Sequence, residues 1–134
     1  AKQAGISLGK RAVEIARDYA TQRVQFGQPI SKLQVISHKL ADMRRKAEMA
    51  RLVTYRTAEI MDAGADARME TAIAKVVATD NDFECANIGM QVMGGAGYSM
   101  EHDMQRLFRD SRLGPIGGGS NEIQRNIIAK LMEL

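Results

Sequence analysis

The chain has 134 residues, of which 45% are hydrophobic and 26% are charged, which is ordinary for one globular domain covering residues 1–134. Its 19 basic and 16 acidic residues are interspersed, the net charge is only +3, and aromatic residues are few, so a nucleic-acid interface is not expected. No apolar run approaches the roughly 20 residues that span a bilayer, and the single Cys85 excludes an internal disulfide.

The beginning of the chain predicts that it is a piece of a longer protein. It starts at Ala1 rather than Met, already inside a helical pattern and with no capping residue ahead of it. Apolar residues at helical spacing predict a first helix over residues 5–21. Gly27 and Pro29 follow in the segment Q-R-V-Q-F-G-Q-P-I, and neither favours continuation of a helix.

The second helix has the clearest pattern. Ser31 and Gln34 have the spacing of a capping box at its start. Apolar or small residues then alternate steps of three and four, which is typical of a seam in a helical bundle. The expected seam residues are Leu33, Ile36, Leu40, Met43, Ala47, Ala50, Thr54 and Met61. A turn at residues 62–66 follows, in which Gly64 ends this helix and Asp66 caps the next.

Three further helices complete the predicted fold: one over about 67–92, a short one over about 102–112, and a last one capped by Ser120 or Asn121. No segment alternates as a β-strand does. We therefore predict an all-α fold, an antiparallel four-helix up-and-down bundle with a short extra helix, in which Cys85 is a small core residue. The residues expected to face the core are Met69, Ile73, Val76, Val77, Phe83, Ala86 and Met90, and in the last helix Ile123, Ile127, Ile128, Leu131 and Met132.

Three joints that contain glycine carry the candidate functional residues: 26–30, 91–98 and 114–123. Turns between helices need glycine for positive φ, which explains one glycine at each joint. It explains less well the run Gly117-Gly118-Gly119, because three flexible residues are entropically costly. A glycine-rich segment that leads into a helix exposes backbone N–H groups to an anion, and the phosphates of a nucleotide-like cofactor are one candidate. The run fits neither a Walker loop nor the dinucleotide fingerprint.

Arg23 comes at the end of the first helix and has two interpretations. It is either a surface cation that stabilises a helix C-terminus or a guanidinium group directed at a phosphate, and the residues alone favour the first. His38 and His102 have no Cys or Asp cluster at ligand spacing, so no metal site is expected.

Taken together, the motifs resemble those of a known family. Y-A-x-x-R-x-Q-F-G-x-x-I, followed by L-Q-x-x-x-H-K-L-A-D-M, is similar to the C-terminal domain of acyl-CoA dehydrogenases. Q-V-M-G-G-A-G-Y and R-x-x-R-D-x-R-x-x-x-I-x-x-G-x-x-E-I-Q extend the resemblance over essentially the whole chain, in order and with the family's spacing.

This resemblance implies a helical bundle that mediates homo-oligomer formation (a dimer or tetramer) and completes the FAD site of a neighbouring subunit. Arg23 would contact the FAD pyrophosphate, and Gly119 would face the acyl-CoA substrate. The residues implied to bind FAD are Arg23, Phe26, Gln34, Gln91, Val92, Met93, Gly94, Gly95, Ser120, Asn121 and Glu122.

In the family reaction a carboxylate base removes the α-proton of an acyl-CoA thioester while the β-hydrogen passes to the flavin as hydride. Many members carry the base in I-Y-E-G-T. Here the matching I-G-G-G-S places Gly118 at the usual glutamate position, so no catalytic residue is expected in this chain. Either the base lies in an E-R-L-like segment upstream of Ala1, as in the long-chain and isovaleryl branches, or the activity is lost or changed. The first is favoured, and neither Glu14 nor Glu122 is expected to be the base.

The resemblance thus implies part of an FAD-dependent acyl-CoA dehydrogenase that passes electrons to an electron-transferring flavoprotein, in the bacterial or archaeal cytoplasm or the mitochondrial matrix. The alternatives are a non-catalytic helical oligomerisation module, and an acyl-CoA oxidase or flavin monooxygenase of the same fold. If the three glycine-bearing joints serve FAD, they are expected to meet at one rim between subunits.

Overall fold

The computed structural model describes residues 4–134, with side chains described from residue 8 onward, so residues 1–3 of the predicted domain lie outside the described part. The elements are the helices α1 (Ala4–Gln22), α2 (Gln34–Asp62), α3 (Arg68–Met93), α4 (Gly95–Tyr98), α5 (Met104–Leu113) and α6 (Asn121–Leu131), the 3-10 turn η1 (Ile30–Lys32), and the short strands β1 (Val24–Gln25) and β2 (Gln28–Pro29). None of these helices is long and apolar enough to cross a membrane.

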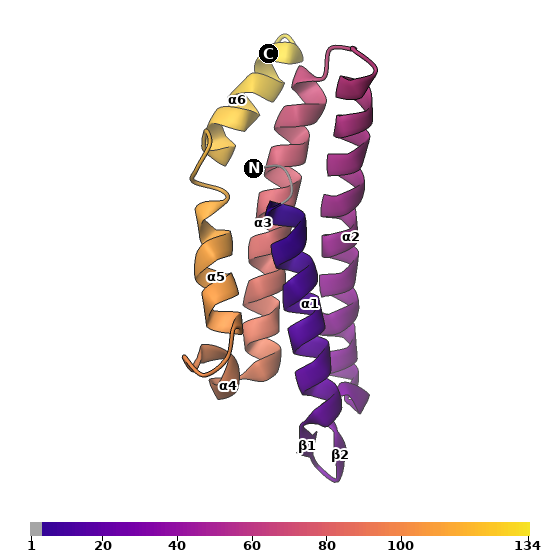
Figure 1. Ribbon diagram of the computed structural model, residues 1–134, viewed down its shortest axis with the longest axis vertical. Helices are drawn as coiled ribbons and strands as arrows, with labels where there is room; N and C mark the ends of the chain where they lie inside the picture. The colour runs from indigo at the N-terminus through magenta and orange to yellow at the C-terminus, as the bar shows by residue number, and fades with distance from the viewer. Residues whose placement is uncertain (1–3) are drawn as a thin grey trace.

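The helices form an antiparallel bundle (Figure 1). Helices α2 and α3 are the long central pair. Helix α1 lies beside them along the half nearer the β1–β2 hairpin, while α5 and α6 follow one another as a fourth column. The predicted up-and-down bundle is confirmed. Its fourth column is broken into two helices by the glycine-rich segment at 114–120.

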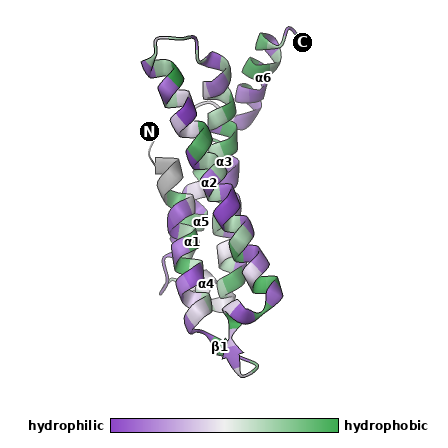
Figure 2. Cartoon of the chain, turned by 90° about the vertical axis from the view of Figure 1, so that its right-hand side faces the viewer, coloured by the Kyte–Doolittle hydropathy of each residue, from purple (hydrophilic) through white to green (hydrophobic). Residues whose placement is uncertain are grey.

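Small residues allow the helices to pack closely. On α1, Ala12, Ala16 and Ala20 recur every four residues and are fully buried. On α2, the buried residues Met43, Ala50 and Thr57 recur every seven, which is the expected seam spacing. Figure 2 shows hydrophilic and hydrophobic residues interspersed along the helices.

Cys85 is a core residue, as predicted. It is fully buried, and its Sγ–H donates to the backbone oxygen of Met43 at 3.3 Å. Burial raises the pKa of the Cys85 thiol to about 12, so the group stays protonated at neutral pH and is not a nucleophile.

Some residues expected in the core are exposed instead. Met61, placed in the seam by its spacing, is 43% exposed, and four others are exposed as well: Ile73, Ile123, Ile127 and Met132. Met132 follows α6 directly, and the others belong to the parts of α2, α3 and α6 that extend past the start of α1 (Figure 1). The bundle has fewer layers there, so a residue on the inward side of its helix is covered less.

The helix caps agree only in part with prediction. Ser31 does not cap α2, because the chain forms η1 over Ile30–Lys32 and Leu33 becomes the cap without a side-chain hydrogen bond. Asp66 accepts from the first backbone amide of α3, that of Arg68, at 3.1 Å. Ser120 caps α6, with its Oγ accepting from the amide of Ile123.

Asn121 fixes the start of α6 to α3. Its Nδ2 donates to Asp80 Oδ1 at 2.7 Å and to Thr79 Oγ1 at 3.0 Å, and its Oδ1 accepts from Lys75 Nζ at 2.7 Å. The side chain is buried, so all of its hydrogen-bonding groups are used within the fold.

We expect Asn121→Ala to lower the free energy of unfolding by about 2 kcal/mol or more, because the partly buried Lys75 and Asp80 each lose a partner. Asn126→Ala, on an exposed part of the same helix, is the matched control and is expected to cost less than about 0.5 kcal/mol. Urea denaturation followed by circular dichroism measures both. Equal losses in the two variants would contradict this role of Asn121.

Candidate functional site

The first glycine-bearing joint forms a tight hairpin. Val24 pairs with Pro29 and Gln25 with Gln28, which leaves a two-residue turn of Phe26 and Gly27. Both turn residues have positive φ, 55° and 77°, the pattern of a type I′ hairpin turn. Glycine adopts this conformation without strain, whereas a phenylalanine there is unusual and costs free energy.

Phe26 is also 88% exposed, so an aromatic ring is held in solvent at the tip of the hairpin. Arg23 lies at the base of the same hairpin, directly after α1, and its side chain is exposed. None of the described carboxylates forms an ion pair with it. The hairpin thus presents a cation at its base and an apolar ring at its tip, both exposed to solvent.

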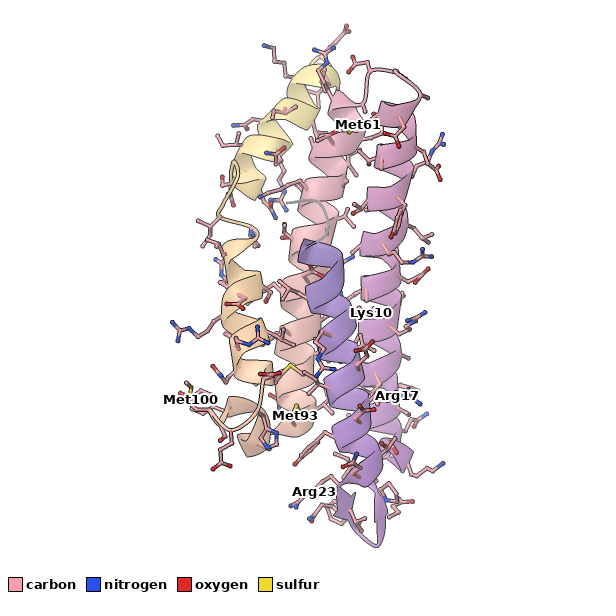
Figure 3. All side chains as sticks on the ribbon, in the orientation of Figure 1. Lys10, Arg17, Arg23, Met61, Met93 and Met100 are labelled. Atoms are coloured by element: carbon pink, nitrogen blue, oxygen red, sulfur yellow. The ribbon has the colours of Figure 1, made fainter. Side chains whose placement is uncertain are left out.

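The second joint lies at the same end of the bundle. Figure 3 places Arg23 and Met93 toward one end, where α3 finishes. Gln34 begins α2 beside this hairpin and is exposed, and Gln91 is exposed on the last turn of α3. A Cβ added at Gly94 or Gly95 would meet nothing within 4 Å, so the backbone there is open to an incoming group.

Two of the residues predicted to contact FAD at this end, Val92 and Met93, could do so only through their backbone atoms. Val92 and Met93 are buried in the hydrophobic core, so neither side chain is available to a cofactor. Between Gln91 and Gly95, the available groups are the side chain of Gln91 and the backbone around Gly94, whose φ is 59°.

The third joint lies elsewhere. Asn121 is bonded to Thr79, which precedes Gln91 by 12 residues on α3. At 1.5 Å per residue this places the start of α6 about 18 Å along the helix axis from Gln91. Within one chain two of the joints share an end and the third lies further along α3 (Figure 1), so the expected meeting of all three at a rim between subunits stays a prediction.

The third joint offers fewer side chains than the sequence suggested. Asn121 is committed to α3, so we leave it out of the proposed site. Glu122 is exposed in the first turn of α6, and its pKa is lowered, first by a backbone hydrogen bond and then by Ser120. Gly118 and Gly119 both have positive φ, 65° and 80°, which favours glycine at these positions.

A cavity lies between this third joint and the helices. Its volume is about 580 Å³, and its wall includes Leu8 of α1, residues of α2 and α3, and Leu113, Gly114, Gly117 and Gly118 of the third joint. Most of the wall is apolar, with alanine, leucine and glycine residues and several threonines. The Gly118 backbone therefore borders a space of the size that binds small molecules.

One carboxylate in the cavity wall was missed in the sequence. Asp82 is only 3% exposed, and its Oδ1 accepts from the backbone N–H of Gly9 on α1 at 3.1 Å. Desolvation raises the pKa of Asp82 to about 7, against the lowering effect of that hydrogen bond. One signal in the sequence could have indicated this buried carboxylate. A lone Asp stands at an inward position of the third helix, within N-D-F-E-C, and the first helix has glycine at position 9.

The other candidate polar groups do not form a catalytic cluster. Glu14 is an exposed residue of α1 near Lys10 and Arg11, as expected for a surface position. His38 and His102 are exposed. Among the residues that the structure describes, no group of three His, Cys, Asp or Glu side chains is arranged to hold a metal ion.

Comparison with known proteins gives a consistent family. The family model for the acyl-CoA dehydrogenase C-terminal domain matches residues 3–133. An acyl-CoA dehydrogenase of Bacillus subtilis (strain 168) is 42% identical over 127 residues, which are 95% of this chain and 34% of that protein. The chain thus spans about a third of the length of this relative.

Two solved structures have the same fold. Butyryl-CoA dehydrogenase from Megasphaera elsdenii aligns with a TM-score of 0.94 at 36% identity, covering 97% of this chain and 34% of that one. The FAD complex of PigA aligns with a TM-score of 0.93 at 30% identity, covering 97% and 34%.

The buried Asp82 predicts a pH-dependent stability. Its pKa is about 7 in the folded chain and 3.8 ordinarily, so the folded state holds the proton more tightly. The contribution of the protonated Asp82 to the free energy of unfolding is fully present below pH 3.8 and is lost as the pH rises through about 7. The loss amounts to about 4 kcal/mol. Relative to Asp82→Asn, the wild type is expected to lose stability over this range in chemical denaturation. The control is Asp42→Asn, an exposed residue paired with Arg45, whose profile follows that of the wild type. Parallel profiles for the wild type and Asp82→Asn would rule out the shift.

Proposed function

The chain belongs to the acyl-CoA dehydrogenase family, and we propose that it is the C-terminal helical part of an FAD-dependent enzyme that introduces a Cα–Cβ double bond into an acyl-CoA thioester. In this role the chain, which we take to be one domain, supplies part of an FAD site and the contacts between subunits. The remaining parts of the site belong to a longer polypeptide, in keeping with the third of a relative's length that the chain spans.

The observation that carries the proposal is Phe26. An aromatic side chain that is 88% exposed, on a backbone with φ of 55°, is costly in an isolated chain. The cost is understandable if a flat, apolar ring system covers it.

The surrounding groups fit FAD. Arg23 is an unpaired guanidinium among the described residues and suits a pyrophosphate, Gln34 and Gln91 offer amide hydrogen bonds, and Gly94 and Gly95 let a ligand approach the backbone. When bound, FAD supplies the two-electron acceptor that no side chain provides. The chain's own residues bind and orient it.

The separation of the three joints supports a site shared between two copies. The hairpin end of one subunit would contact FAD on one side, and Gly119, Ser120 and Glu122 of another would contribute on the substrate side. Exposed apolar side chains on α2 and α6, such as Leu52 and Ile123, support an assembly that covers them, a homodimer or homotetramer.

The proton acceptor is proposed to lie upstream of Ala1. Gly118 carries no side chain, Glu14 is on the surface, and Glu122 is held in its ionised form by hydrogen bonds that lower its pKa. Reoxidation by an electron-transferring flavoprotein and a cytoplasmic or mitochondrial-matrix location complete the proposal.

Two alternatives remain distinguishable. A purely structural oligomerisation module explains the exposed apolar faces but gives no reason for a strained, exposed Phe26 on the same hairpin as the exposed Arg23. An acyl-CoA oxidase or flavin monooxygenase of the same fold uses the same flavin-side residues, and would be recognised by its consumption of oxygen.

In the full-length protein, Arg23→Ala is expected to weaken FAD binding about 10- to 100-fold, because a hydrogen bond to a charged group contributes about 1.5–3 kcal/mol. Lys32→Ala, a nearby exposed cation on η1, is the control and should leave affinity unchanged. Fluorescence titration of the flavin-stripped protein measures both, and thermal unfolding checks that stability changes by less than about 0.5 kcal/mol. Unchanged flavin affinity in Arg23→Ala would remove Arg23 from the site.

Residues 1–134 alone are expected to fold as helices, to self-associate and to bind FAD weakly, since they contain only part of the site. Circular dichroism, sedimentation and visible absorbance test the three expectations. A yellow preparation with one flavin per chain would contradict the third.

A further inference from the structure

The glycine-rich segment between α5 and α6, residues 114–120, is held at both ends by α3. At its start, a Cβ added at Gly114 would lie 3.0 Å from the Cβ and Cγ2 atoms of Thr79, so glycine lets the segment pass close to α3. Directly after its end, Asn121 Nδ2 donates to Thr79 Oγ1 at 3.0 Å. Both ends of the segment therefore contact the same residue of α3.

Backbone hydrogen bonds also close the segment on itself. The amide of Asn121 donates to the carbonyl oxygen of Pro115 at 2.9 Å, and the amide of Gly117 donates to that of Leu113 at 2.8 Å. Gly118 and Gly119 are exposed, and a Cβ added at Gly118 would meet none of the described residues within 4 Å. The closed segment therefore presents exposed backbone at these two glycines.

Asp80, the residue of α3 after Thr79, joins the end of the segment to the first turns of α6. Its Oδ1 accepts from Asn121 Nδ2 at 2.7 Å, and its Oδ2 accepts from Arg125 Nη2 at 3.3 Å. One carboxylate thus holds the first residue of α6 and a residue about one turn later. Two contacts at different heights on α6 fix the direction in which this helix begins.

These contacts matter because the segment has little stiffness of its own. Gly117, Gly118 and Gly119 are consecutive, and glycine loses more conformational freedom on ordering than any other residue. Gly118 and Gly119 have φ of 65° and 80°, one of several conformations open to glycine. Contacts with α3 restrict these choices before a ligand arrives, which lowers the entropic cost of binding.

We propose that Asp80 is a positioning residue: through Asn121 and Arg125 it holds the backbone of residues 118–120 in the conformation that contacts the acyl-CoA. The inference rests on the proposed function, which places Gly119 and Ser120 on the substrate side of the shared site. It deepens that function by naming a residue of α3 that acts on substrate affinity through other residues.

The test measures KM and kcat of the full-length, FAD-loaded enzyme with an acyl-CoA substrate that it turns over. Asp80→Ala is expected to raise KM roughly tenfold and to change kcat less than about twofold, because a loosened segment must be ordered each time substrate binds. Asp80→Asn keeps an acceptor for Asn121 and is expected to recover most of the affinity. Circular dichroism and flavin absorbance check that each variant is folded and holds FAD.

Asn121→Ala breaks the same contact from the other side. It is expected to raise KM as Asp80→Ala does, and the double variant is expected to raise KM no further, because the two changes remove one shared interaction. An additive effect in the double variant would contradict the shared contact and overturn the proposal.

Asp66→Ala is the matched control. Asp66 also accepts from a backbone amide and pairs with an arginine, Arg68. Arg68 precedes Asp80 by 12 residues, about 18 Å along α3, so this change lies away from the glycine-rich segment. It is expected to lower the urea midpoint of unfolding and to leave KM unchanged.

The remaining outcomes separate this inference from the proposed function. An unchanged KM in folded, flavin-loaded Asp80→Ala, or an equal rise in Asp66→Ala, overturns the positioning role and leaves the dehydrogenase function intact. A fall in kcat at unchanged KM, or loss of FAD from the folded variant, also overturns it, because the effect would then fall on the chemical step or on the cofactor. If the flavin-loaded wild type turns over no acyl-CoA substrate, the proposed function fails and this inference fails with it.

Discussion

Close packing around α3 determines where every functional group of this chain lies. The other helices contact it, and its buried positions are mostly small: Ala72, Ala74, Cys85, Ala86 and Gly89. Small side chains on a central helix let its neighbours approach, as Ala12, Ala16 and Ala20 do from α1. Because α3 is a long helix, the distance between two elements that pack against it is set by the positions at which each contacts it.

Two attachment regions on α3 therefore have different properties. Helix α3 ends in the exposed Gly94 and Gly95, at the same end of the bundle as the β1–β2 hairpin (Figure 1), where Phe26 and Arg23 are exposed to solvent. Near its middle, the network of Asn121 with Lys75, Thr79 and Asp80 fixes the start of α6. Within one chain these two regions stay about 18 Å apart along the helix, and the assembly of two copies that we propose would bring the two kinds of region to one site.

The sequence predicted the helices well because their signals are local. Glycine and proline mark the ends, and the recurrence of Met43 and Ala50 defines a seam that the structure confirms. Non-local effects were harder to predict. Ser31 lost its capping role because the preceding residues formed a 3-10 turn, and Met61 is exposed because α1 does not reach that part of the bundle.

The candidate site shows the same division between local and non-local information. Motifs identified Arg23, Phe26 and the glycines, but spacing along the chain did not reveal that Asn121 is used internally or that Val92 and Met93 point into the core. The inward position of Asp82 could be read from the helical pattern, but its pairing with a glycine 73 residues away could not.

The pairing of Asp82 with Gly9 also makes the stability of the fold depend on pH. Desolvation favours the protonated carboxyl group, so the free energy of unfolding falls as Asp82 ionises, while the pH rises through about 7.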